Sequence, residues 1–275
     1  MMMNTKKSLY TLSILLLCAM APLTVGACAG ENGQEIPPST ASDPGNSAGE
    51  DSQISAYKGK VVENTGGALL ICGAEDNAGS GELYHLSLDG LALSDAGGQS
   101  LTAAAVEPGA IVEVDFDGMI LETFPAGFSH PSALRVLSQS ANLVGLYLEV
   151  IDDLYQTDEG LNEGIEIIAL DLTDAENLSG AEKSALLYLV GNHTGVETRE
   201  ATYDGLVEEG LIDSQRLSFE KGLLFSFSDM KFGEQSFTFD VQKWRGGDGA
   251  YFFADCEAKK SGGAWSYSVG QEMIS

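Results

Sequence analysis

The sequence predicts an α+β protein, with a small β-barrel at residues 56–140 and an α+β domain at residues 141–275. Two observations lead to this prediction. In the first region, short runs of alternating apolar and polar residues are separated by Gly, Pro and Asp turns, which is typical of a barrel. In the second region, helical patterns come first and strand patterns follow. This order favours helices packed on one face of an antiparallel sheet.

The barrel region contains several short strand patterns. Gly66-Gly67 interrupts the first two and predicts a hairpin between them. Asp117-Gly118 predicts a second hairpin, because this pair favours tight turns. Residues 91–105 have an ambiguous pattern. The expected strands are residues 60–63, 69–72, 83–88, 111–116, 119–124 and 133–137.

The second region opens with three predicted helices. Asn142 caps the first, in which apolar residues recur on one face. Ser179–Glu182 has the capping-box pattern and opens the second, which Gly195 ends. Thr202 caps the short third helix, and Gly210 closes it. The apolar residues of the first helix are Leu143, Leu146, Val150 and Leu154. The expected strands are residues 165–172, 223–227, 236–243, 250–258 and 264–269.

The N-terminus has the layout of an export signal. Lys6 and Lys7 precede a short apolar run at residues 9–23, and Val25-Gly26-Ala27-Cys28 follows. This ending resembles the lipobox of bacterial lipoproteins, although Val25 stands where Leu is preferred. The resemblance implies cleavage of residues 1–27, lipidation of Cys28 and attachment to the extracytoplasmic face of the cell membrane. A plain cleaved signal and an uncleaved anchor are the alternatives.

Residues 28–55 are rich in Gly, Pro, Ser and acidic residues, which predicts a flexible tether. The whole chain has a formal net charge of −27, and removal of residues 1–27 would change it to −29. No basic cluster interrupts this charge. Nucleic acid is therefore not an expected partner, and neither is anionic lipid bound through side chains.

Two further resemblances concern the folded regions. Residues 106–114 and 117–126 resemble an OB-fold-like domain of Gram-positive secreted proteins and lipoproteins, which carry a similar D-G-x-I-x-E-x-x-P-A stretch. This resemblance covers residues 58–137 and implies a five-stranded barrel without a defined activity. Most of residues 143–275 resemble domains of secreted Firmicutes proteins. That resemblance rests on residues 158–162, 169–172, 243–246 and 249–251.

Few residues suggest metal or nucleophilic chemistry. Cys72 and Cys256 lie in strand patterns, either as buried free thiols, which we favour, or as a disulfide. No Cys/His cluster indicates a zinc site. Residues 45–49 match G-x-S-x-G but lie in the tether, without the strand and helix that this motif needs. Surface or structural roles are expected for the histidines His85, His130 and His193.

The segment Lys243–Gly249 is the main candidate site. We interpret it as a loop in which Lys243, Trp244 and Arg245 could bind an anionic or aromatic ligand. The alternative is structural, with Trp244 in the core and Arg245 paired to an acidic residue. Facing carboxylates for acid/base chemistry could come from Glu166, Asp171 and Asp174.

These features predict a lipid-anchored extracytoplasmic protein that serves as a binding or interaction module. Its expected partners are the membrane, through Cys28, and a surface ligand or protein of unknown identity. No catalytic residue, metal or cofactor is assigned. The alternative is a carboxylate-dependent hydrolase that acts on an envelope or dietary polymer near Trp244.

Overall fold

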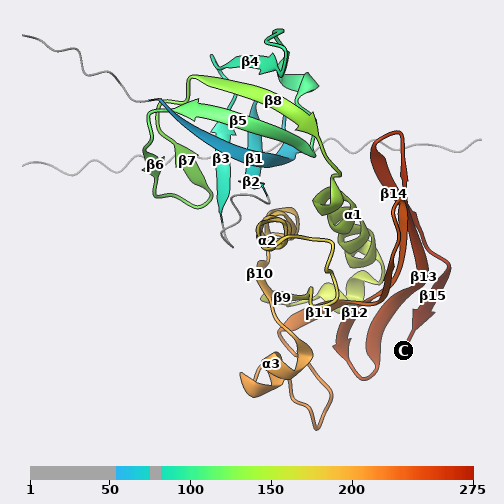
Figure 1. Cartoon of the computed structure of the whole chain (residues 1–275). Coiled ribbons are helices and arrows are strands. Elements are labelled where there is room, and N and C mark those ends of the chain that lie inside the picture. Colours follow the sequence, from blue (N-terminus) through green and yellow to red (C-terminus); the bar gives the residue numbers. More distant parts are fainter. Residues whose placement is uncertain (1–53, 75–81) are drawn as a thin grey trace, which may run out of the picture. The chain divides into compact units, whose positions relative to one another are not determined.

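The computed structural model describes residues 54–74 and 82–275, which belong to one compact unit. They form two β-sheets together with helices, which confirms the α+β class (Figure 1). The predicted signal sequence, Cys28 and the G-x-S-x-G match lie outside the described residues. Among the described helices, none is both long and apolar enough to span a bilayer.

The first sheet is an eight-stranded half-barrel with the order β4-β8-β5-β1-β2-β3-β7-β6. Alternating apolar residues point into its core, as Val112, Val114 and Phe116 do from β5. The ambiguous segment contains strand β4 and a 3₁₀ turn, η2. The elements are β1 Ser55–Asn64, β2 Ala68–Gly73, β3 Leu83–Ser87, β4 Ala92–Asp95, η2 Ala103–Ala105, β5 Ala110–Phe116, β6 Ile120–Leu121, β7 Ala126–Phe128 and β8 Ala133–Gln139.

The hairpin predicted at Asp117-Gly118 is wrong. Strand β5 pairs with β1 and β8, whereas β6 pairs with β7. The Asp117 side chain accepts a hydrogen bond from the Met119 amide, and Gly118 has a φ of 88°. These features form a turn, but both edges of β5 are already occupied by β1 and β8, so the chain that follows cannot pair with it, and the reversal occurs between β6 and β7.

The second sheet has the order β10-β9-β11-β12-β13-β14, and β15 also pairs with β13. The predicted caps are present, since the Asn142, Ser179 and Thr202 side chains each accept from a backbone amide in the first turn. The elements are α1 Leu143–Gln156, η3 Glu159–Asn162, β9 Ile167–Asp171, α2 Gly180–Thr194, β10 Glu197–Glu200, α3 Tyr203–Glu208, β11 Gly222–Phe232, β12 Ser236–Gly246, β13 Gly249–Ser261, β14 Ala264–Ser268 and β15 Gln271–Ile274.

Two expectations for this sheet need correction. The sheet is mixed, because β9 runs parallel to both β10 and β11. A parallel pair needs a crossover, and α2 is the crossover between β9 and β10. The helices also lie on both faces. Ile168 and Leu170 pack in the cluster that contains α1 and α2, whereas Ala169 packs with Leu206 of α3.

One apolar cluster joins the two sheets. Val62, Leu70, Cys72 and Leu83 of the half-barrel pack with buried residues of α1 and α2. Cys72 and Cys256 are both buried free thiols, so the favoured interpretation of the cysteines is confirmed. The boundary predicted near residues 138–142 remains a prediction about independent folding.

Candidate functional site

Lys243 lies within β12 rather than in a loop, and its side chain is fully buried. Its ammonium donates hydrogen bonds to the carbonyls of Tyr155 and Asp158, at 3.3 and 3.1 Å, and to that of Thr157. A fourth bond, of 3.2 Å, reaches Asn162 Oδ1. Desolvation lowers the pKa of Lys243 to about 8, although nearby acidic side chains oppose the shift. Lys243 thus fastens the end of α1 to the sheet.

Arg245 has a similar set of partners. Its Nη1 donates to the carbonyls of Leu161 and Glu163, both at 2.7 Å, and its Nη2 donates to the Glu220 carbonyl at 2.9 Å. These bonds hold the segment after α1 against the start of β11. Both cations thus donate to oxygens of the chain itself, and the described partners of Arg245 are carbonyls rather than the acidic residue that the structural alternative expected.

Trp244 points to the opposite face, because side chains alternate along a strand. Its ring meets that of Tyr203 from α3 edge to face, with 5.4 Å between centroids and an interplanar angle of 70°. It is half-buried against the cluster under α3. Trp244 and Tyr203 together form an aromatic border on this face of the sheet.

This face contains a hollow of about 510 Å³, which we call the sheet hollow. The pairing register explains its polar row: Ser226 of β11 lies opposite Asp171 of β9 on one side and Gln242 of β12 on the other. Gln242 Nε2 donates to Ser226 Oγ at 2.9 Å. None of the described side chains that line the hollow is cationic. The lining includes Asp171, Asp174, Tyr203, Ser226, Gln242 and Trp244.

The three predicted carboxylates are only partly brought together. Asp171 and Asp174 both line the sheet hollow, but Glu166 does not. Glu166 accepts a 2.8 Å hydrogen bond from Lys221 at an exposed position. Asp171 also has a local role, because its Oδ1 accepts from the amide and hydroxyl of Thr173. One oxygen of Asp171 is therefore engaged in a turn.

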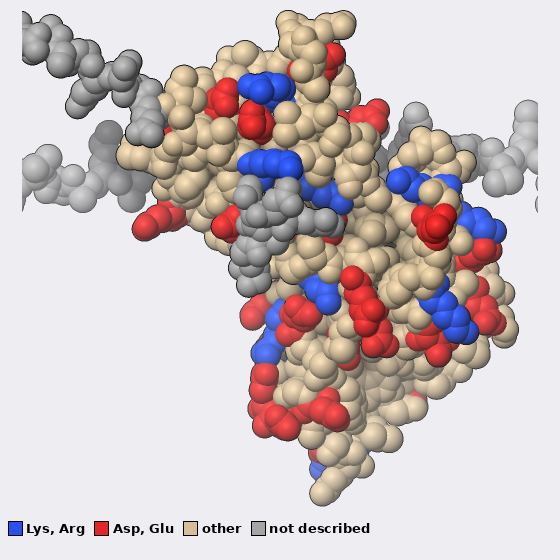
Figure 2. Space-filling view, in the orientation of Figure 1, with Lys and Arg blue, Asp and Glu red and all other residues tan. Residues whose placement is uncertain are grey.

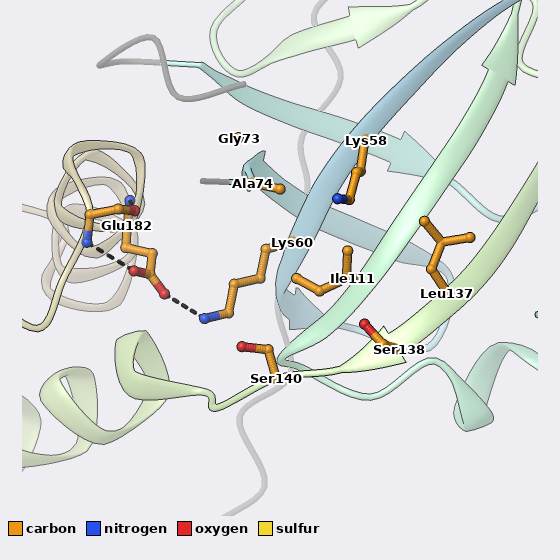
Figure 3. Close-up of a pocket in the computed structure, with 10 residues that line it drawn as sticks. Lys58, Lys60, Gly73, Ala74, Ile111, Leu137, Ser138, Ser140 and Glu182 are labelled. Atoms are coloured by element: carbon orange, nitrogen blue, oxygen red, sulfur yellow. Dashed lines mark hydrogen bonds and ion pairs between the residues drawn. The ribbon is translucent and has the colours of Figure 1, made fainter. Parts of the chain in front are cut away.

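A second cavity, of about 330 Å³, lies where the half-barrel meets α2 (Figure 3). Lys60 Nζ donates to Glu182 Oε1 at 2.6 Å, and these side chains are only 12% and 8% exposed. The other carboxylate oxygen of Glu182 accepts from the Ser179 amide at 2.9 Å. This ion pair links the half-barrel to α2, and only its capping-box half could be predicted from the sequence.

In the part of the chain that the structure describes, the remaining charged residues form no concentrated site. On the face drawn in Figure 2, Lys and Arg side chains lie among Asp and Glu side chains. His130 and His193 pair with Asp117 and Asp152, each at 2.8 Å, and His85 is exposed. Within residues 54–74 and 82–275, no group of His, Cys, Asp and Glu is arranged to hold a metal ion.

Sequence reasoning missed Tyr203, Ser226 and Gln242 as members of a site. For Ser226 and Gln242 the available signal was the alternation in residues 222–228 and 240–246, which places both on one face once the strands are aligned. Tyr203 lies in α3, outside these segments. Comparison with known proteins adds no further information, because no protein-family description, curated protein or solved structure matches the chain.

Proposed function

We propose that this protein is a lipid-anchored extracytoplasmic binding protein and that the sheet hollow is its binding site. The observation that supports the proposal is the row of Asp171, Ser226 and Gln242 beside the aromatic border formed by Trp244 and Tyr203. An aromatic surface next to a few convergent polar groups is a common composition for a ligand site.

The chemistry of the hollow selects the class of ligand. Carboxylates accept hydrogen bonds, and the described lining has two carboxylates and no cation, so an anion would be repelled. The fitting ligand therefore donates hydrogen bonds and has an apolar face that can lie on Trp244. A sugar unit of an envelope or dietary polymer has both properties.

The half-barrel fits the OB-like expectation in its strand pairing. Strands β1, β2 and β3 are consecutive neighbours, and β1 also pairs with β5. Strand β5 pairs with β8 as well. Strand β8 in turn pairs in parallel with β4, which is the strand that follows β3 in the chain. If β3 and β4 count as one bent strand, these pairings form a five-stranded ring. We propose on this basis that the half-barrel is OB-like.

Binding in the hollow can be tested with soluble oligosaccharides from bacterial cell wall and from plant polysaccharide. Asp174→Asn should weaken binding at least tenfold, because a hydrogen bond to a charged group contributes about 1.5–3 kcal/mol. Glu166→Gln is the matched control, since Glu166 lies outside the hollow. Titration calorimetry on both variants measures the change. Equal weakening by the two variants, or no binding by the wild type, would refute the site.

The hydrolase remains a second candidate because Asp171 and Asp174 line the same hollow. The same oligosaccharides distinguish the two functions. A binding protein returns them intact, whereas a hydrolase releases new reducing ends, and Asp171→Asn should abolish that release. Reducing-end release by the wild type would therefore replace the binding proposal with the hydrolase.

The lipid anchor has its own test. Wild-type protein should carry acyl chains on Cys28, visible as added mass, and should fractionate with membranes. Cys28→Ser removes the thiol that is acylated, so most of this variant should leave the membrane fraction. The lipobox interpretation is wrong if wild type and variant have no acyl mass and fractionate alike.

A further inference from the structure

Four large apolar side chains of one short segment face solvent. Met119, Ile120, Leu121 and Phe124 are 60%, 40%, 51% and 74% exposed. We call residues 119–128, which contain β6, β7 and the turn between them, the apolar hairpin (Figure 1). Leu121 lies over Gly127, which has no side chain to cover it. Such a concentration of exposed apolar groups marks an interaction surface.

The apolar hairpin begins beside the point where the described chain enters the half-barrel. Ser55, the first residue of β1, pairs with Phe116. A Cβ placed on Gly118 would lie only 2.8 Å from Ser55 Oγ. Met119 follows Gly118 directly. The segment that leads to the proposed anchor therefore joins the folded body next to the exposed apolar side chains.

The length of this segment limits how far the apolar hairpin can lie from a bilayer that holds Cys28. The segment comprises residues 29–54. Its composition predicts a flexible tether, and a flexible chain of this length has a root-mean-square span of about 25–30 Å. The hairpin is thus kept near the bilayer at a high effective concentration, which lets a weak contact form.

We infer that the apolar hairpin is a second membrane contact, which inserts its side chains into the interface of the bilayer that holds the anchor. The inference rests on the lipid anchor of the proposed function. Apolar burial provides the attraction, because a chain with a net charge of −27 gains none from lipid charge. The contact should therefore favour a zwitterionic surface, and anionic lipid should weaken it.

Vesicle flotation tests the contact, with a chain that begins at residue 28. Every sample carries Cys28→Ser, so no acyl chain contributes. Because the contact is weak without the anchor, wild-type hairpin protein should float only in part and only with phosphatidylcholine vesicles in large excess. Met119→Ser/Leu121→Ser should reduce this partitioning at least tenfold. The matched control is Met273→Ser/Ile274→Ser in β15, where the side chains are 46% and 70% exposed. Melting curves of both variants should match the parent, since the changed side chains are exposed.

Phosphatidylglycerol in the vesicles should weaken flotation, and high salt should restore it by screening the repulsion. The inference is overturned if the parent does not float or if both double variants lose the same amount. It is also overturned if flotation increases with phosphatidylglycerol, which would indicate a charge-driven contact. Because Cys28 is replaced in every sample, these outcomes are separate from the acyl-mass test of the anchor.

Discussion

Replacing Lys243 with methionine is expected to lower the free energy of unfolding by about 3 kcal/mol. Methionine fills much of the same space but cannot donate hydrogen bonds. The carbonyls of Tyr155, Thr157 and Asp158 then lose a donor whose own side chain is fully buried. Relief of the buried charge offsets only part of this loss. Urea unfolding of the wild type and the variant at neutral pH measures the difference.

Lys259→Met is the matched control for this measurement. Lys259 lies on the neighbouring strand β13, but its side chain is 62% exposed and pairs only with Glu257. An exposed ion pair contributes less than about 1 kcal/mol, so the control should unfold almost as the wild type does. Similar losses in both variants would show that the buried hydrogen bonds of Lys243 do not stabilise the fold.

The second large effect is a loss of stability in alkaline solution, caused by the two buried thiols. Desolvation raises the pKa of Cys72 and of Cys256 from 9.0 to about 12. Unfolded thiols lose their protons above pH 9, whereas the folded ones retain them. Each protonated thiol therefore makes its full contribution to the free energy of unfolding below pH 9. Between pH 9 and 12 that free energy falls by about 4 kcal/mol per thiol.

Urea unfolding at pH 9 and pH 10 tests this prediction. Cys72→Ala should lose about 1 kcal/mol less stability over that interval than the wild type, because one thiol no longer titrates. Val62→Ala is a control in the same cluster that keeps both thiols, so its pH dependence should parallel the wild type. Burial lowers the pKa of Lys243, so its contribution to stability increases with pH over this interval. All three proteins contain Lys243, so this contribution is the same in each of them. Parallel curves for all three proteins would contradict the prediction.

The helices could be predicted closely because their signals are local. Each capping residue acts within one turn, as Ser179 and Glu182 do in the capping box. Strand β10 could not be predicted in the same way. Its four residues, Glu197–Glu200, have no apolar alternation, and they form a strand only because β9 offers a parallel partner. Strand β15 is exposed along its length and depends equally on its partner, β13.

The candidate site shows the same limit. Lys243, Trp244 and Arg245 are adjacent in sequence, which suggested one loop, but the strand turns Trp244 to the face opposite its neighbours. The carboxylate and amide beside Trp244 come from β9 and from another position of β12. Their closeness depends on strand register, which a single sequence does not specify when pairing is non-local.

The Glu182 carboxylate has a consequence for how the protein loses its structure. One oxygen completes the first turn of α2, and the other holds Lys60 of the half-barrel. Fraying of that helical turn therefore also breaks the ion pair with Lys60, and separation of the half-barrel from the apolar cluster around Val62 exposes the turn to water. The two events become thermodynamically cooperative through a single side chain. Partial opening at this junction is thereby disfavoured relative to opening of both elements together.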